Sequence, residues 1–195
     1  MVRSVKFSLI LALGVAATGA GVYLLIPREP SYQGRSLSAW LADLDLESRK
    51  AQARPAEALR AIGTNAFPSL RRMLLSRSPI WERTSIAINA NQSLVQFSVT
   101  PDNVVRNRAL RGYHALGNEA KDDVSRLIEL MERETSPQVR CYIALALGNI
   151  GPAARAAIPV LQKATFDRNQ EVHKNAIWAL ANIQMWTPES SAMLH

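Results

Sequence analysis

The sequence contains little from which a disulfide-linked or metal-dependent centre could be built. Among its 195 residues there is one cysteine, Cys141, and there are three histidines. A single thiol cannot form an intramolecular disulfide or supply a cysteine-rich zinc site. His114, His173 and His195 have no second histidine three or four residues away, so one helix cannot present a pair of them to a metal. We therefore expect no metal and no cofactor.

Local catalytic motifs are also missing from the sequence. It has neither a nucleophile elbow nor a phosphate-binding loop. Acidic residues do cluster at Asp122-Asp123 and from Glu129 to Glu134, and paired carboxylates can act as acid and base. Basic residues alternate with them, however, which is typical of a solvated helix face. We therefore identify no catalytic residue.

Aromatic residues make up only 6% of the chain, whereas Ala and Leu are abundant. Helices favour Ala and Leu, and strands favour aromatic and β-branched side chains. The composition therefore predicts an all-α protein.

Positive charge is unevenly distributed along the chain. Residues 49–111 hold eleven Lys or Arg and three Asp or Glu, whereas residues 112–195 hold eight and nine. A basic region of this kind can bind anionic lipid, an acidic protein or nucleic acid. It can also be a solvated face of arginines lying over helix surfaces, which is the interpretation that we favour.

An uncharged run from Phe7 to Ile26 follows Arg3 and Lys6. Its twenty residues would rise about 30 Å as a helix, which matches the hydrocarbon thickness of a bilayer. Because the apolar run resumes at Val22 after a group of small residues, we favour an uncleaved anchor over residues 1–26. The basic flank would stay in the cytoplasm, so this single-pass membrane protein would place its remaining residues in the periplasm or at the cell surface. A secreted form with the signal removed is the alternative.

The chain after the apolar run divides into a linker and a repeat domain. Residues 27–35 contain two prolines and a glycine and are expected to be a linker. Residues 36–195 are expected to form a helical domain with an irregular segment at 76–99. The helices predicted by apolar stripes, glycine stops and Ser-Pro or Thr-Pro starts are 36–44, 49–62, 66–75, 80–97, 100–116, 119–134, 136–150, 152–166 and 168–183, the last with Asp167 as its N-cap.

Two short phrases recur with a common period after residue 100. An apolar residue followed by glycine occurs at 116–117 and 150–151, and Asn182-Ile183-Gln184 repeats the second copy without its glycine. Valine followed by a basic residue occurs at positions 105, 139 and 172. The steps from 105 to 139 to 172 equal those from 116 to 150 to 183, so both phrases keep the same spacing. Such a period is typical of stacked helix pairs, which bury their apolar faces only against neighbouring pairs.

The stretch from Ser136 to Leu161 resembles the HEAT-repeat family, in the bacterial form related to the PBS-lyase repeats of the ARM-type fold. It contains the Val-Arg start, the Ala-Leu-Gly middle, the Ile-Gly-Pro turn and the Ile-Pro-x-Leu second helix of that family. The resemblance covers about residues 48–75 and 100–183, with departures at His173 and Gln184. It implies a right-handed solenoid of about four helix pairs.

The resemblance also implies roles for particular residues. Arg106 and Arg140 would pair with acidic or carbonyl groups of an adjoining repeat, or would line a binding groove. Some similar proteins are iron-dependent hydroxylases with His-Glu dipeptides, and no histidine here is followed by glutamate. An enzyme or enzyme accessory of the lyase or hydroxylase type remains the alternative function.

We expect a non-catalytic scaffold for protein–protein interaction or assembly at a membrane. In this family the second helix of each pair is expected to line the concave side. Nucleic acid is not expected as a partner, because an extracytoplasmic location argues against it. The residues expected to contact a protein partner are Arg71, Arg72, Lys121, Arg126, Arg155 and Lys163.

Overall fold

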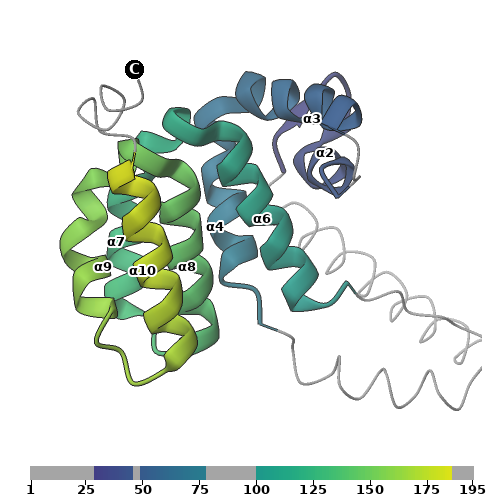
Figure 1. Cartoon of the computed structure of the whole chain (residues 1–195). Helices are drawn as coiled ribbons and strands as arrows, with labels where there is room; N and C mark the ends of the chain where they lie inside the picture. Colours follow the sequence, from purple (N-terminus) through teal and green to yellow (C-terminus); the bar gives the residue numbers. More distant parts are fainter. Residues whose placement is uncertain (1–28, 46–48, 78–99, 186–195) are drawn as a thin grey trace, which may run out of the picture.

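The computed structural model describes residues 29–45, 49–77 and 100–185, and within these ranges the chain is mostly helical (Figure 1). The predicted anchor at 1–26, the predicted helix at 80–97 and residues 186–195 lie outside the described residues. The elements in chain order are β1 (Ser31–Tyr32), β2 (Arg35–Ser36), α2 (Leu37–Asp43), α3 (Arg49–Ile62), the 3₁₀ turn η1 (Gly63–Ala66), α4 (Phe67–Leu74), α6 (Asp102–Leu116), the 3₁₀ turn η2 (Gly117–Asp123), α7 (Val124–Arg133), α8 (Pro137–Ile150), the 3₁₀ turn η3 (Gly151–Ala157), α9 (Ile158–Ala164) and α10 (Gln170–Met185).

The helices form pairs, as the repeat period predicts. α3 is joined through η1 to α4, α6 through η2 to α7, and α8 through η3 to α9, while α10 follows as a further first helix. The first helices α3, α6, α8 and α10 contact one another in that order (Figure 1). The predicted helical repeat body is therefore confirmed for the described part of the chain.

A small hairpin precedes the first pair, where the sequence predicts a linker. β1 pairs antiparallel with β2, and the turn between them places Gln33 at φ 49° and Gly34 at φ 73°. Positive φ at both turn residues matches the twist of a two-residue hairpin. The indole N–H of Trp40 donates to the carbonyl of Tyr32 over 3.1 Å, and the guanidinium of Arg35 lies 4.1 Å above the Trp40 ring. Residues 31–36 are thus fastened to α2 rather than irregular.

Glycines with positive φ end the first helix of each complete pair. Gly63, Gly117 and Gly151 have φ of 58°, 49° and 74°, a region that L-residues with a Cβ rarely enter. A 3₁₀ turn follows each glycine before the second helix begins. The second helices α7 and α9 are consequently shorter than predicted, because the first part of 119–134 and of 152–166 is 3₁₀ structure.

α10 behaves differently because Gln184 stands where its predecessors have glycine. The helix continues through this position to Met185, whereas α8 stops at Ile150. Its N-terminus also differs from the prediction of an Asp167 cap. The side chain of Asn169 accepts from the amides of Glu171 and Val172, so Asn169 is the residue that caps the helix.

The core follows the repeat positions. Leu127 and Leu161, one repeat apart, are both fully buried, and so are Val139 and Val172, which are also one repeat apart. Val105, at the preceding equivalent position, is only partly buried. Full burial of such side chains stabilises the fold by roughly 1.5–3 kcal/mol each.

One stretch of the described chain, from Pro137 to Ala164, has the length and hydropathy of a membrane span. It contains the α8–η3–α9 helical hairpin, which turns at Gly151. α8 lies in the centre of the array, with most of its apolar residues buried. We therefore assign this stretch to the protein core.

Two helix crossings depend on the lack of a side chain. A Cβ on Gly148 of α8 would lie 2.5 Å from the ring of Trp178 and 2.9 Å from the Cα of Ala179, both on α10. A Cβ on Gly112 of α6 would lie 2.7 Å from the end of the Leu70 side chain on α4. Glycine lets these helices approach closely.

Candidate binding surfaces

Arginines from the basic region bridge successive helix pairs. Arg77, just after α4, pairs with Glu134 at 2.7 Å, and Arg108 of α6 pairs with Asp45 near α2 at 2.9 Å. Arg111 donates to the carbonyl of Leu44. Many of the arginines predicted to lie over solvated helix surfaces therefore form ion pairs and hydrogen bonds between successive helical elements.

A buried polar triad joins α4, α6 and η2. The carboxylate of Asp123, which is 2% exposed, accepts from the guanidinium of Arg71 and from the hydroxyl of Tyr113 at 2.7 Å. Burial raises the pKa of the Asp123 carboxyl, and the hydrogen bonds from Tyr113 and Arg71 oppose that rise. Burial and the adjacent carboxylate raise the pKa of Tyr113. The triad holds two helix pairs together, because three polar groups satisfy one another away from water.

The basic residue after each repeated valine also acts inside the array. Arg140 pairs with Asp167 at 2.7 Å, Arg106 donates to the carbonyl of Ser76, and His173 donates through Nδ1 to the carbonyl of Thr165. The expectation that these arginines bind acidic or carbonyl groups is confirmed. His173 makes the equivalent contact where the family pattern has arginine.

The six candidate contact residues do not form one site. Arg71 belongs to the buried triad, and Arg126 pairs with Glu129 on the same helix. Lys121 and Arg155 are exposed at equivalent places on η2 and η3, one repeat apart. Arg72 and Lys163 line separate hollows near the ends of α4 and α9. That these six residues contact a partner stays a prediction, and in the folded chain the guanidinium of Arg71 also binds the buried carboxylate of Asp123.

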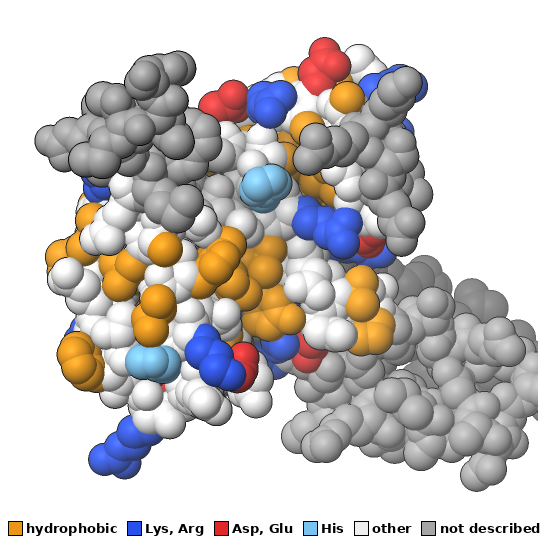
Figure 2. Space-filling view, in the orientation of Figure 1, with side chains coloured by type: hydrophobic (Ala, Val, Ile, Leu, Met, Phe, Trp, Pro, Cys, Tyr) orange, Lys and Arg blue, Asp and Glu red, His pale blue; other side chains and the backbone are white. Residues whose placement is uncertain are grey.

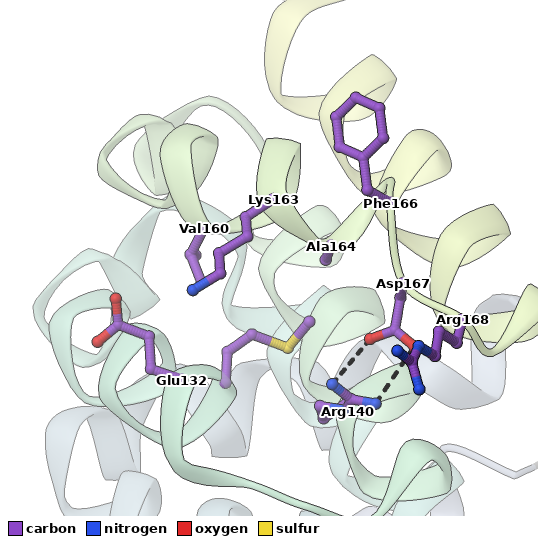
Figure 3. Close-up of a pocket in the computed structure, with 9 residues that line it drawn as sticks. Glu132, Arg140, Val160, Lys163, Ala164, Phe166, Asp167 and Arg168 are labelled. Atoms are coloured by element: carbon purple, nitrogen blue, oxygen red, sulfur yellow. Dashed lines mark hydrogen bonds and ion pairs between the residues drawn. The ribbon is translucent and has the colours of Figure 1, made fainter.

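The hollow beside Lys163 has a volume of about 530 Å³ and an apolar floor. Its floor is formed by Met131 of α7 with Val160 and Ala164 of α9, while the Arg140–Asp167 pair closes one edge (Figure 3). The ring of Phe166, which is 88% exposed, points away from the other lining side chains. The hollow thus lies between two second helices.

A different surface crosses the first helices near their C-terminal ends. One hollow of about 420 Å³ lies between α3 and α6, and another of about 410 Å³ lies between α6, α8 and α10. His114 of α6 lines both of them. Because His114 belongs to the lining of both hollows, we treat the two as one surface, which we call the first-helix groove. Its lining residues are Leu44, Gln52, Ala56, Arg60, Arg111, His114, Ala115, Gly117, Asn118, Gly148, Asn149, Ile150, Gly151, Pro152, Trp178 and Asn182.

Figure 2 shows hydrophobic side chains across the face that carries α8 and α10, with Lys, Arg and His side chains beside them. Trp178 and Ile177 of α10 are 42% and 48% exposed, which is high for large apolar residues. This face therefore combines apolar and basic chemistry.

Comparison with protein families identifies the repeat. Residues 124–195 match the family model for HEAT repeats. This part of the chain is a HEAT-repeat array. None of the curated proteins shows significant similarity to the chain. The relation to the bacterial PBS-lyase subtype stays a prediction.

The HEAT-repeat assignment clarifies which features are shared and which belong to this chain. The glycine turns and the buried Val and Leu positions are the repeating frame. Among the described residues there is no group of three or more His, Cys, Asp or Glu side chains placed to hold a metal ion. The polar triad does not recur in the next repeat, where Leu147 and Ala157 stand at the positions of Tyr113 and Asp123.

The sequence analysis missed the groove although the repeat spacing contained a signal for it. His114, Gly148 and Ala181 occupy the same position in three successive repeats. Glycine at the second of these positions admits the Trp178 ring, which lines the groove. Aligning the HEAT repeats on their glycines, rather than searching for charged residues, would have revealed this column.

Proposed function

We propose that this HEAT-repeat protein is a non-catalytic scaffold that binds a protein partner at a membrane. HEAT repeats generally mediate protein–protein interaction. Residues 7–26 would anchor the chain, and the repeats would form a right-handed superhelix outside the cytoplasm. A secreted form with the signal removed would bind the same partner without the anchor.

The observation that carries this proposal is the first-helix groove. It runs across the boundaries of successive repeats, from Arg60 on α3 to Asn182 on α10. Repeat proteins bind extended partners on such continuous surfaces, because each repeat contributes equivalent positions. Exposed tryptophan is also enriched where proteins contact one another.

Photocrosslinking in native membranes tests the proposal directly. A photoreactive amino acid would replace exposed Ala181, next to the groove residue Asn182, or exposed Pro159 on α9, in the full-length chain. We expect a discrete, saturable protein adduct from at least one position, identified by mass spectrometry. If neither position gives a protein adduct, the scaffold function is wrong.

N-terminal sequencing and carbonate extraction of the same membranes test the anchor. An intact N-terminus and retention in the membrane would support tethering through residues 7–26. A new N-terminus between residues 16 and 27 together with release into the soluble fraction would support the secreted form.

A further inference from the structure

The first-helix groove has two halves of different chemistry that meet at His114. The half between α3 and α6 is lined by the guanidinium groups of Arg60 and Arg111, and no carboxylate of the described residues lines it. The half between α6 and α10 is lined by Trp178 and by the amides of Asn118, Asn149 and Asn182. The groove is thus cationic at one end and aromatic at the other.

The arginines of the cationic half retain donors for a further acceptor. The Nε of Arg60 lies 3.8 Å from the carboxylate of Glu119, and its side chain is 54% exposed. The Nε of Arg111 lies 3.6 Å from Asp45, whose other oxygen is held at 2.9 Å by Arg108. Distances above about 3.5 Å are ion pairs without a hydrogen bond. Arg111 also donates through Nη1 to the carbonyl of Leu44. Since each guanidinium has five N–H donors, both retain donors that can bind another carboxylate.

The aromatic half is shaped by the packing of Trp178. Its ring rests against Gly148, where an added Cβ would lie 2.5 Å from the ring. The indole is therefore held in one position, yet Trp178 remains 42% exposed. Asn149 donates to the carbonyl of Leu110 over 3.2 Å, which fixes its amide at the groove wall. Fixed amides and an exposed ring suit the backbone and an apolar side chain of an extended peptide.

We propose that the first-helix groove binds an extended acidic segment of another protein, with carboxylates at Arg60 and Arg111 and an apolar side chain at Trp178. The inference rests on the proposed scaffold function and names the chemistry of its partner. Charge complementarity selects a carboxylate-bearing segment at the α3–α6 end. The uncharged amide and aromatic half favours a polypeptide over a lipid surface, because headgroups would offer no apolar side chain there.

Synthetic peptides test this chemistry with the full-length chain in detergent micelles. The probes are fluorescein-labelled peptides of about ten residues, which extend over roughly 33 Å. Each carries a Glu-Glu pair and one Leu at a varied separation in a Gly/Ser background. Fluorescence anisotropy measures the dissociation constant. We expect at least one separation to bind, and exchange of Leu for Ser to weaken that binding.

Charge reversal on both sides gives the decisive comparison. Arg60→Glu should weaken the acidic peptide by about tenfold, which corresponds to the loss of one charge-assisted hydrogen bond. A version of the peptide with one Glu of the pair changed to Lys should recover binding to the Arg60→Glu chain, because the new carboxylate attracts the Lys while Arg111 still binds the remaining Glu. Arg133→Glu, at an exposed cation of α7 outside the groove, is the matched control and should leave both affinities unchanged. Circular dichroism checks that each variant is folded.

A separate substitution, at Trp178, tests the aromatic half of the groove. Trp178→Leu keeps an apolar side chain on Gly148 but removes the ring, so the chain should lose affinity for the Leu-bearing peptide while the Ser peptide binds as before. A merely structural role for Trp178 would change the affinity for both peptides equally.

Three results would overturn the inference. They are no binding of any acidic peptide, an equal effect of Arg60→Glu and Arg133→Glu, and binding to phosphatidylglycerol vesicles that depends on Arg60 while peptides do not bind. The scaffold function fails separately, through the lack of crosslinked protein. Adducts from position 159 alone would retain the scaffold and refute this groove as the binding site.

Discussion

The two ends of the array are held together by different chemistry. Between the first two helix pairs, α6 and the neighbouring turn bind α2 and α4 through Arg71–Asp123, Arg108–Asp45 and the Arg111 contact with Leu44. Between α8 and α10 the helices pack mainly through apolar contacts, with Trp178 directly on Gly148, and the Arg140–Asp167 pair lies just before the beginning of α10. The same repeat can therefore use either ionic or apolar contacts between neighbouring helices, which we call ionic and apolar joints. Either kind works if the side chains fill the space and every buried polar group has a hydrogen-bond partner.

The polar triad shows this difference between ionic and apolar contacts at individual residues. Asp123 occupies the position that Ala157 takes in the next repeat, and Tyr113 is likewise equivalent to Leu147. Ala157 and Leu147 are fully buried apolar residues. The buried carboxylate of Asp123 therefore stands where the next repeat has the methyl group of Ala157. The carboxylate is tolerated in the interior because Arg71 and Tyr113 bind both of its oxygens.

The largest effect is expected from breaking the triad. Asp123→Ala should lower the free energy of unfolding by about 3 kcal/mol, because the substitution leaves Arg71 and the Tyr113 hydroxyl without their acceptor. Chemical denaturation of the full-length chain followed by circular dichroism measures this loss. Asp122→Ala, at the exposed neighbour, should have almost no effect. Equal losses from the two substitutions would contradict a special role for the triad.

A smaller loss of stability is expected from adding a methyl group between α8 and α10. Gly148→Ala should cost about 2 kcal/mol, since the new methyl group meets both the Trp178 ring and the backbone of Ala179. Gly112→Ala is the matched substitution at the other joint. There the methyl group meets only side-chain ends of Leu70 and Leu41, at 2.7 and 3.0 Å, and gains helix propensity. We expect Gly112→Ala to be less destabilising in the same denaturation experiment; the reverse order would show that α8 and α10 can separate freely.

The pH dependence of the ionic joint distinguishes burial from ion pairing. The pKa of Asp123 is raised in the folded state from 3.8, so above this value the native protein binds more protons than the unfolded chain. The stability of the native protein relative to Asp123→Asn should therefore fall as pH rises from 3.8 through the folded pKa. Denaturation of both proteins across this range measures the difference. A relative stability that rises with pH would mean that Arg71 outweighs burial.

The smallest effect is expected at the exposed Arg60. Arg60→Gln should leave the free energy of unfolding within about 0.5 kcal/mol of the unmodified chain, because surface pairs at long distance contribute little. The pair with Glu119 is 3.8 Å long and both side chains are more than half exposed. Thermal or chemical denaturation checks this. A larger loss would place Arg60 among the structural arginines of the first joint.

The sequence predicted the helices well because their signals are local. Glycine stops at Gly63, Gly117 and Gly151 and the Ser-Pro start before α8 act within a few residues. The common spacing of the two repeated phrases then indicated which helices are equivalent. The 3₁₀ turns were missed because their geometry depends on packing against the neighbouring turn.

The role of the arginines could not be read from the sequence for a different reason. Arg71 and Asp123 are 52 residues apart, and the intervening segment does not follow the regular period. Contact over such a separation follows from the three-dimensional stacking of pairs. The same is true of the first-helix groove, whose lining residues come from α3, α6, α8 and α10.

The ionic joint also implies that dissolved salt acts on one end of the array. Partly exposed arginine contacts such as Arg108–Asp45 are screened as ionic strength rises, since the Debye length falls to about 3 Å at 1 M. The apolar contact of α8 with α10 is not weakened by screening, and salts such as sulfate strengthen it. Rising salt should therefore weaken the contacts at the α2–α6 end while leaving those at the α8–α10 end intact. The two ends of the array would then differ in stability at high ionic strength.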